Sequence, residues 1–180
     1  MALFIPTYFS PISQYAAIKK ADDITLEIED NYEKQTYRNR CYIFGANGKQ
    51  ALNIPVKFEV SSIKKKTKDA LVDNDAKWQS HHLKSLQSAY RNSPFFEFYI
   101  DDLLPIFKKE YKFLLDVNLD TFQLVSDALE LNKTYKKSQE YELEVEKFLF
   151  EFRQGINLKY VRDIAYEKKK LKVAEMKIFD

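Results

Sequence analysis

Residues 31–56, which read NYEKQTYRNRCYIFGANGKQALNIPV, contain the pattern that decides the fold of this chain. Cys41–Phe44 and Ala51–Ile54 are short apolar runs, and Asn47-Gly48 between them can supply the positive φ angles of a tight turn. This pattern predicts a β-hairpin. The eleven residues Asn31–Cys41 include two Tyr, two Arg, two Asn, a Lys, a Gln and a Glu. Such a density of hydrogen-bonding groups indicates contact with an anion, a sugar or the protein's own backbone.

Before the hairpin, the sequence predicts a strand, a helix and a second strand. Ala2–Ile5 is typical of a short buried strand, and Ser10-Pro11 is a favourable helix start with Ser10 as the N-cap. Apolar and polar residues alternate over Ile24–Ile28, which is the period of a strand. Elements in this order favour a βαβ unit with a parallel pair of strands.

After the hairpin, the sequence predicts a mostly helical half. The predicted fold class is therefore mixed α/β, in one domain with a strand-rich half over residues 1–72 and a helical half over 73–180. The first expected helix runs from Asp73-Asn-Asp75 to about Arg91, and an aromatic cluster over Pro94–Ile100 then packs back as a short helix. A helix capped by Asp101-Asp102 follows, with a joint at Val117-Asn118. The last expected helices are one over Leu119–Leu131 and one through Leu143–Phe152 that ends at Gly155.

Composition limits the classes of function. The net charge is only +2, with 29 basic and 27 acidic residues interspersed, which argues against a nucleic-acid binder. The basic run Lys64–Lys68 has no interleaved aromatic residues, and a solvated loop is expected there. A single cysteine excludes an internal disulfide and a cysteine-based zinc site. Without a signal peptide or membrane span in the sequence, we expect a cytoplasmic protein.

His82 is the candidate for acid–base catalysis. Trp78, His82, Leu86 and Tyr90 follow one another at intervals of four and therefore share one face of the predicted helix. His82 then lies in the middle of a stripe that is either buried or lines a cleft. Because imidazole titrates near neutral pH, it can act as a general acid or base. The alternative is a core histidine that is hydrogen-bonded to Tyr90 or to a backbone carbonyl.

Arg38 and Arg40 are the candidates for anion binding. If this run is extended, both side chains point to one face, and their planar donors suit a phosphate or carboxylate. The alternative is a set of ion pairs with Glu29, Asp30 or Glu33. The residues expected to supplement the arginines or to shape the pocket are Lys34, Tyr37, Asn39, Trp78 and Tyr90.

The motifs that would identify a cofactor do not occur in the sequence. With only 3 Gly there is no phosphate-binding Walker loop and no dinucleotide fingerprint, and no GxSxG elbow occurs. Two His and one Cys argue against most transition-metal sites, so no metal is predicted and no cofactor is identified. Cys41 would need a thiolate-stabilising setting to be a nucleophile, and a buried free thiol is the alternative.

An ordered series of short stretches runs from about Phe4 to Asp120. They are Pro6–Ile12 with Tyr15, Ala21–Asp23, Asn31–Cys41, Gly45–Gly48, Ile54–Val56, Trp78–His82, Leu86, Ser88–Tyr90 and Pro94–Phe96. In this series the chain resembles the WbqC-like protein family. The family is named from gene clusters for surface polysaccharide (O-antigen), so the resemblance implies that biological setting more than it implies a mechanism. Met176–Asp180 resembles the beginning of the family's C-terminal segment, and we expect either a truncated chain or a member that lacks the final helix.

Together these features give two hypotheses and a weaker third. In the first, the protein is a transferase that modifies an activated or carrier-linked sugar, with Arg38 and Arg40 on a phosphate and His82 moving a proton. In the second, it is a non-catalytic accessory protein that binds sugar or phosphate. The third is a nucleic-acid binder that uses the basic run. The oligomeric state is left open.

Overall fold

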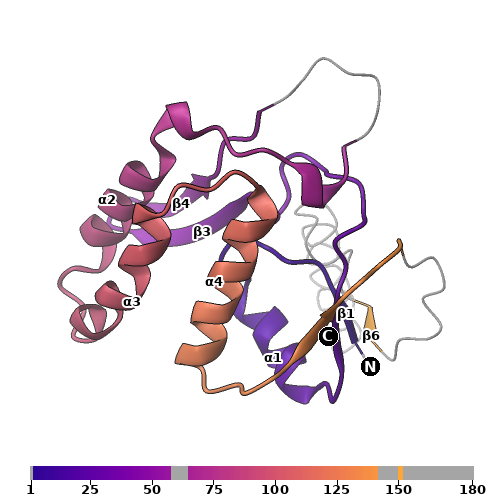
Figure 1. Ribbon diagram of the computed structural model, residues 1–180. Coiled ribbons are helices and arrows are strands. Elements are labelled where there is room, and N and C mark those ends of the chain that lie inside the picture. The colour runs from indigo at the N-terminus through magenta and orange to yellow at the C-terminus, as the bar shows by residue number, and fades with distance from the viewer. Residues whose placement is uncertain (1, 58–64, 142–149, 152–180) are drawn as a thin grey trace, which may run out of the picture.

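Figure 1 shows the computed structural model, which describes residues 2–57, 65–141 and 150–151. Their fold is mixed α/β, with a hairpin in the N-terminal half and helices after it, and the predicted fold class is confirmed. The strands are β1 (Ala2–Phe4), β2 (Ile24–Leu26), β3 (Arg40–Gly45), β4 (Gly48–Asn53), β5 (Tyr135–Lys137) and β6 (Phe150–Glu151). The α-helices are α1 (Ile12–Lys20), α2 (Trp78–Tyr90), α3 (Phe96–Lys108) and α4 (Leu114–Ala128).

A four-stranded parallel sheet has the strand order β5-β2-β1-β6. β1 pairs with β2 from Ala2↔Ile24 to Phe4↔Leu26, and α1 connects the two strands, so the predicted βαβ unit is confirmed. The predicted N-cap is wrong. Pro11 occupies the N-cap position of α1, and the Ser10 hydroxyl instead forms a hydrogen bond with the Thr7 hydroxyl at 2.6 Å.

The hairpin forms as predicted, with a small shift of its turn. β3 and β4 pair from Arg40↔Asn53 to Gly45↔Gly48, so the two-residue turn is Ala46-Asn47, one residue earlier than expected. Gly48 has a φ of 96°, a left-handed conformation that a residue without Cβ adopts easily. Alternation along β3 turns Cys41 toward the core and Arg40 toward the opposite face.

The predicted start of α2 requires a correction. Asp73 accepts a hydrogen bond from the backbone N–H of Asp75 at 3.3 Å, but it caps the short 3₁₀ turn Asn74–Ala76. The α-helix itself begins at Trp78, after Lys77 with a left-handed φ of 47°. Asp73 therefore caps the turn that precedes α2, and the prediction that it begins the long helix is wrong.

Three further predictions about the helical half are wrong. Asp101-Asp102 do not cap a helix, because α3 has already begun at Phe96 and continues through Pro105. The aromatic residues near its start do not pack back: Phe95 is 67% exposed and Phe98 is 74% exposed. The predicted joint at Val117-Asn118 lies inside α4, where both side chains are completely buried.

The last described strands were not predicted. β5 pairs with β2, and β6 pairs with β1 at the other side of the sheet. Phe150–Glu151 form β6, so the helix predicted through Leu143–Phe152 is wrong at these two residues. The rest of that predicted helix and the segment after it lie outside the described residues. Residues 58–64, which include Lys64 at the start of the basic run, also lie outside them.

Two buried clusters of apolar side chains meet at α4. One lies between the hairpin, α2, α3 and the first turns of α4, and it includes Cys41, Trp78 and Tyr111. The other lies between the parallel sheet, α1 and the later turns of α4, and it includes Phe4 and Phe122. Figure 1 shows α4 standing between these two groups of elements. The hairpin is thereby held on α2, with its outer face free of the core.

Candidate functional site

His82 lies in the core, with both ring nitrogens hydrogen-bonded. It is 4% exposed, and its Nδ1 lies 2.9 Å from the Tyr8 hydroxyl while its Nε2 lies 3.1 Å from the carbonyl oxygen of Asn53. A carbonyl can only accept, so Nε2 carries the proton, and Nδ1 accepts from Tyr8. Burial is the main cause that lowers the pKa of His82 to about 4; the hydrogen bond to the Asn53 carbonyl opposes this shift, and the neighbouring His81 adds to it. These contacts are those of the core alternative, and the catalytic role stays a prediction.

Trp78 and Tyr90 shape the packing around His82 and the hairpin. Trp78 is 2% exposed, and its ring meets the rings of Tyr8 and His82 edge-on. Tyr90 lies at the other end of α2, where its hydroxyl oxygen accepts a hydrogen bond of 3.1 Å from the backbone N–H of Phe44. Trp78 therefore fills the core, and Tyr90 attaches the hairpin to α2.

Arg38 is engaged by acidic neighbours. It is 4% exposed, its Nε donates to Asp30 Oδ2 at 3.1 Å, and its Nη2 also donates to that oxygen. Its Nη1 lies 3.2 Å from the Thr36 hydroxyl and 3.6 Å from a carboxylate oxygen of Glu33. This is the ion-pair arrangement that the sequence left open beside the anion site.

Asn39 and Arg40 lie at the start of the hairpin. The Asn39 side chain donates to the carbonyl oxygen of Ile54 at 2.9 Å, and its backbone carbonyl accepts from the Ile54 N–H at 2.8 Å. Arg40 is partly exposed, and its Nε donates to the Asn53 side chain. Residues 34–35 and 37–38 form turns, so the run is not extended, and Arg38 and Arg40 do not form the predicted fork. Asn39 therefore forms hydrogen bonds with the hairpin backbone at Ile54, whereas the side chain of Arg40 extends to the surface.

The outer face of the hairpin brings two cations to one tyrosine. Nη1 of Arg40 donates to the Tyr42 hydroxyl at 3.5 Å, and Nζ of Lys49 lies 3.8 Å from the centroid of the Tyr42 ring. Tyr37 meets the same ring edge-on, with 6.1 Å between the centroids. Within the described residues, neither Arg40 nor Lys49 forms an ion pair with a carboxylate. We call Tyr37, Arg40, Tyr42 and Lys49 the hairpin face.

Of the predicted site residues, the structure brings Tyr37 and Arg40 together on the hairpin face. Lys34 is exposed on the preceding turn. His82 lies on the opposite side of β4, because it bonds to the Asn53 backbone from the core side, whereas Arg40 bonds to the Asn53 side chain. Arg38 and His82 share no hydrogen-bond partner. The structure therefore does not unite the predicted anion and proton-transfer groups in one pocket.

Buried carboxylates follow the end of β2, and each has a partner. Glu27 accepts a hydrogen bond of 2.7 Å from the Ser138 hydroxyl. Glu29 accepts from Lys66 at 2.5 Å and from Lys68 at 2.6 Å, and these bonds lower the pKa of the Glu29 carboxyl. The described end of the basic run is therefore anchored on Glu29, which corrects the expectation of a solvated loop for that part.

Cys41 has the surroundings of a buried structural thiol. It is 5% exposed and packs in the cluster that contains Trp78. Burial raises the pKa of the Cys41 thiol to about 12. Because the thiolate is the nucleophilic form, these surroundings favour the alternative of a free thiol in the core.

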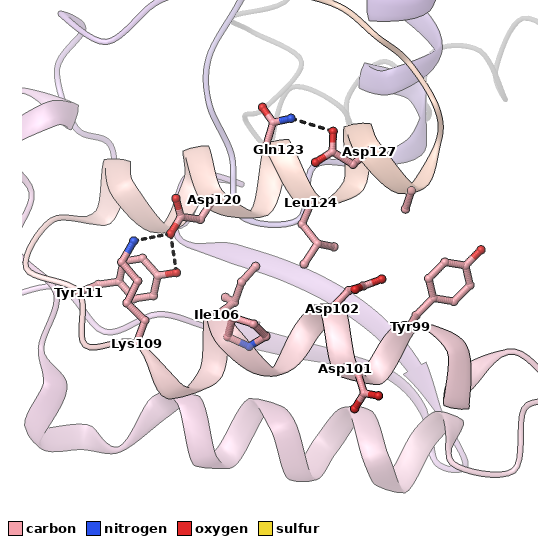
Figure 2. Close-up of a pocket in the computed structure, with 12 residues that line it drawn as sticks. Tyr99, Asp101, Asp102, Ile106, Lys109, Tyr111, Asp120, Gln123, Leu124 and Asp127 are labelled. Atoms are coloured by element: carbon pink, nitrogen blue, oxygen red, sulfur yellow. Dashed lines mark hydrogen bonds and ion pairs between the residues drawn. The ribbon is translucent and has the colours of Figure 1, made fainter.

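A groove of about 620 Å³ lies between α3 and α4 (Figure 2). Figure 2 shows Ile106 and Leu124 pointing toward each other across its centre, and Asp102 pointing from α3 toward α4. At one end, Asp120 Oδ2 accepts hydrogen bonds of 2.7 Å from Lys109 and 2.8 Å from the Tyr111 hydroxyl. The groove thus combines an apolar centre with polar groups at its rim.

Three features were not predicted from the sequence: Lys49, Tyr42 and the groove between α3 and α4. The strand alternation that begins at Arg40 would have placed Tyr42 and Phe44 on the same face, and hairpin pairing would have brought Lys49 across from Phe44, diagonally to Tyr42. The groove was harder to predict from the sequence, because Asp102 was interpreted as part of a helix cap. Only the packing of α3 against α4 shows that Asp102 and Asp120 line one space.

The described residues contain neither a candidate metal centre nor a helix that could cross a membrane. Residues 2–57, 65–141 and 150–151 contain no group of three or more His, Cys, Asp or Glu side chains arranged to hold a metal ion. None of the helices in this part of the chain combines the length and the apolar character needed to span a bilayer.

Comparison with known proteins found one family. The model of a family described as the WbqC-like protein family matches residues 6–167 of the 180-residue chain. No curated protein and no solved structure matches the chain significantly. The match therefore covers the hairpin face and the groove and assigns a role to neither.

Proposed function

The chain belongs to the WbqC-like protein family, and from this premise we propose that it is a non-catalytic accessory protein that binds a phosphorylated sugar during surface-polysaccharide assembly. The phosphate is bound by Arg40 and Lys49 of the hairpin face, and the sugar lies near Tyr37 and Tyr42. The single observation on which this proposal rests is that both cations contact Tyr42 while neither pairs with a carboxylate within the described residues.

The physical chemistry of the hairpin face suits a phosphate. The guanidinium of Arg40 presents planar donors that match phosphate oxygens, and the ammonium of Lys49 adds a second positive charge. Both groups are already oriented by Tyr42, so less side-chain freedom is lost on binding. The face is a sheet surface rather than a deep pocket, which suits a ligand attached to a larger carrier.

The transferase hypothesis receives less support from the geometry. It requires Arg38 and His82 to act on one substrate, yet Arg38 is bound to Asp30, and His82 uses both nitrogens within the core. A proton-transferring group must reach its substrate directly or through one water molecule. We therefore place the binding function first and keep transfer of a sugar as the alternative.

Calorimetric titration with glucose 1-phosphate tests the proposal. We expect Arg40→Met to weaken binding about tenfold, because a charge-assisted hydrogen bond is lost, and Lys49→Met to weaken it by a smaller factor. Binding should also weaken as salt is added, since the site is exposed. Lys19→Met, which removes an exposed lysine of α1, is the matched control and should bind like the wild type.

The titration also separates the two hypotheses. Unchanged affinity in Arg40→Met, or no saturable binding by the wild type, would overturn the proposal. If His82→Gln weakens binding while Arg40→Met does not, the ligand lies on the core side of β4, and the transferase hypothesis takes precedence.

A further inference from the structure

The groove between α3 and α4 has the composition of a binding site for an uncharged ring. Its volume of about 620 Å³ falls within the range of small-molecule pockets. Ile106, Leu124 and Pro105 supply apolar surface along its length. Tyr99, which is 49% exposed, lines one end with an aromatic ring that stacks on no other ring within the described residues. A flat ligand with one apolar face can lie between these groups.

The rim of the groove offers hydrogen-bond acceptors. Both bonds to Asp120 from Lys109 and Tyr111 go to Oδ2, so Oδ1 is left for a ligand. Asp102 is exposed, forms no ion pair within the described residues and points toward α4 (Figure 2). An ionised carboxylate accepts hydrogen bonds and donates none, so its natural partners are hydroxyl or amine donors.

The charge of the groove selects against anions. Asp102, Asp120 and Asp127 line it, and Lys109 is the lining cation. A phosphate placed here would meet carboxylates across a short distance, and like charges in a partly enclosed site repel strongly. The hairpin face has the opposite sign, with two cations around Tyr42. The two surfaces share no residue, so they suit different parts of a ligand or different ligands.

We infer that the groove between α3 and α4 binds a sugar unit that carries no phosphate. Its ring packs on Ile106, Leu124 and the Tyr99 side chain, and its hydroxyls donate to Asp102 and to Oδ1 of Asp120. This site goes beyond the proposed function, because phosphate binding at the hairpin face does not depend on it.

An amide-shift titration of the whole chain by NMR tests this inference. The probes are glucose, galactose, mannose and N-acetylglucosamine, each raised to tens of millimolar, and glucose 1-phosphate at the same concentrations. We expect at least one uncharged sugar to shift the backbone signals of Tyr99, Ile106 and Leu124 in a saturable manner. Glucose 1-phosphate should leave these signals in place and shift those of the hairpin face.

Variants make the assignment specific. Asp102→Ala should weaken the binding of the uncharged sugar about tenfold, because it removes a charged acceptor. Glu97→Ala removes an exposed carboxylate from the same helix outside the groove and should leave the affinity unchanged. Equal weakening in both variants would overturn the inference, as would failure of all four sugars to shift the groove signals. A groove that responds to glucose 1-phosphate as strongly as to a neutral sugar would overturn it too.

Discussion

Arg38 and Arg40 are two residues apart and have opposite surroundings. Arg38 is buried against Asp30 and Thr36, where removal of the guanidinium would leave an uncompensated carboxylate in the interior. Arg40 stands on the hairpin face, where its partners are the uncharged side chains of Asn53 and Tyr42. Burial and the sign of the neighbouring charge thus make one arginine part of the fold and leave the other available to a ligand.

The surroundings of His82 predict that the stability of the protein depends on pH. Its folded pKa of about 4 lies below the ordinary value of about 6.5 expected for the unfolded chain. Between these values the unfolded state binds more protons, so stability falls as pH falls from about 6.5 to about 4. The loss from this residue is about 3 kcal/mol at most.

Chemical unfolding of the wild type and of His82→Gln across this pH range measures the effect. The wild type should lose more stability than the variant, and the imidazole signals of His82 should not titrate near pH 6.5. An imidazole that titrates at its ordinary value, together with parallel pH profiles for the two proteins, would contradict the buried assignment.

The element that organises the molecule is α4. Asn118 lies completely buried on this helix, and its Nδ2 donates to the carbonyl oxygens of Pro6 at 3.1 Å and of Arg38 at 2.9 Å. One side chain thereby joins the loop after β1 to the turn before β3. The parallel sheet and the hairpin are positioned relative to each other partly through this residue.

Asn118→Ala should therefore destabilise the protein by about 3 kcal/mol, because two buried carbonyls lose their donor. Gln123→Ala, on an exposed position of the same helix, is the control and should change stability by less than about 1 kcal/mol. Denaturant unfolding measures both values. If the two variants unfold at the same denaturant concentration, α4 does not hold the loops in the way described.

Elements with a strong local pattern could be predicted from the sequence, and elements that depend on distant partners could not. The hairpin and the βαβ unit follow from alternation and turn residues close together in the chain. β5 is three residues long and exists because it pairs with β2, more than 100 residues earlier. Asp101-Asp102 resembled a cap because the aromatic residues before them were predicted as a separate short helix and not as the first turns of α3.

In the candidate site, too, the features with a strong local pattern could be predicted, and those that depend on distant partners could not. The spacing of four correctly placed Trp78 and His82 on one buried face, but Tyr8, the partner of His82, lies 74 residues away. The prediction that both arginines point to one face assumed an extended run, whereas residues 34–35 and 37–38 form turns and the strand begins only at Arg40. The Arg38–Asp30 pair therefore replaced the predicted fork, for a reason that only the tertiary structure shows.

At the scale of the whole molecule, charge is unevenly distributed despite a net charge of only +2. The hairpin face presents Arg40 and Lys49, and the groove between α3 and α4 presents Asp102, Asp120 and Asp127. α2 packs on β3, α3 packs on α2, and α4 packs on α3, so the hairpin face and the groove are formed by different elements. A molecule of this design can hold an anionic group on one surface and a neutral sugar on another.

The most direct test of the account follows the side-chain Nε–Hε signals of both arginines in one native sample during a titration with glucose 1-phosphate. Because Arg40 faces the ligand and Arg38 is bound to Asp30, we predict that the Arg40 signal moves in a saturable manner while the Arg38 signal stays in place. Movement of the Arg38 signal with a stationary Arg40 signal would contradict the account. The ligand would then enter on the core side of the hairpin.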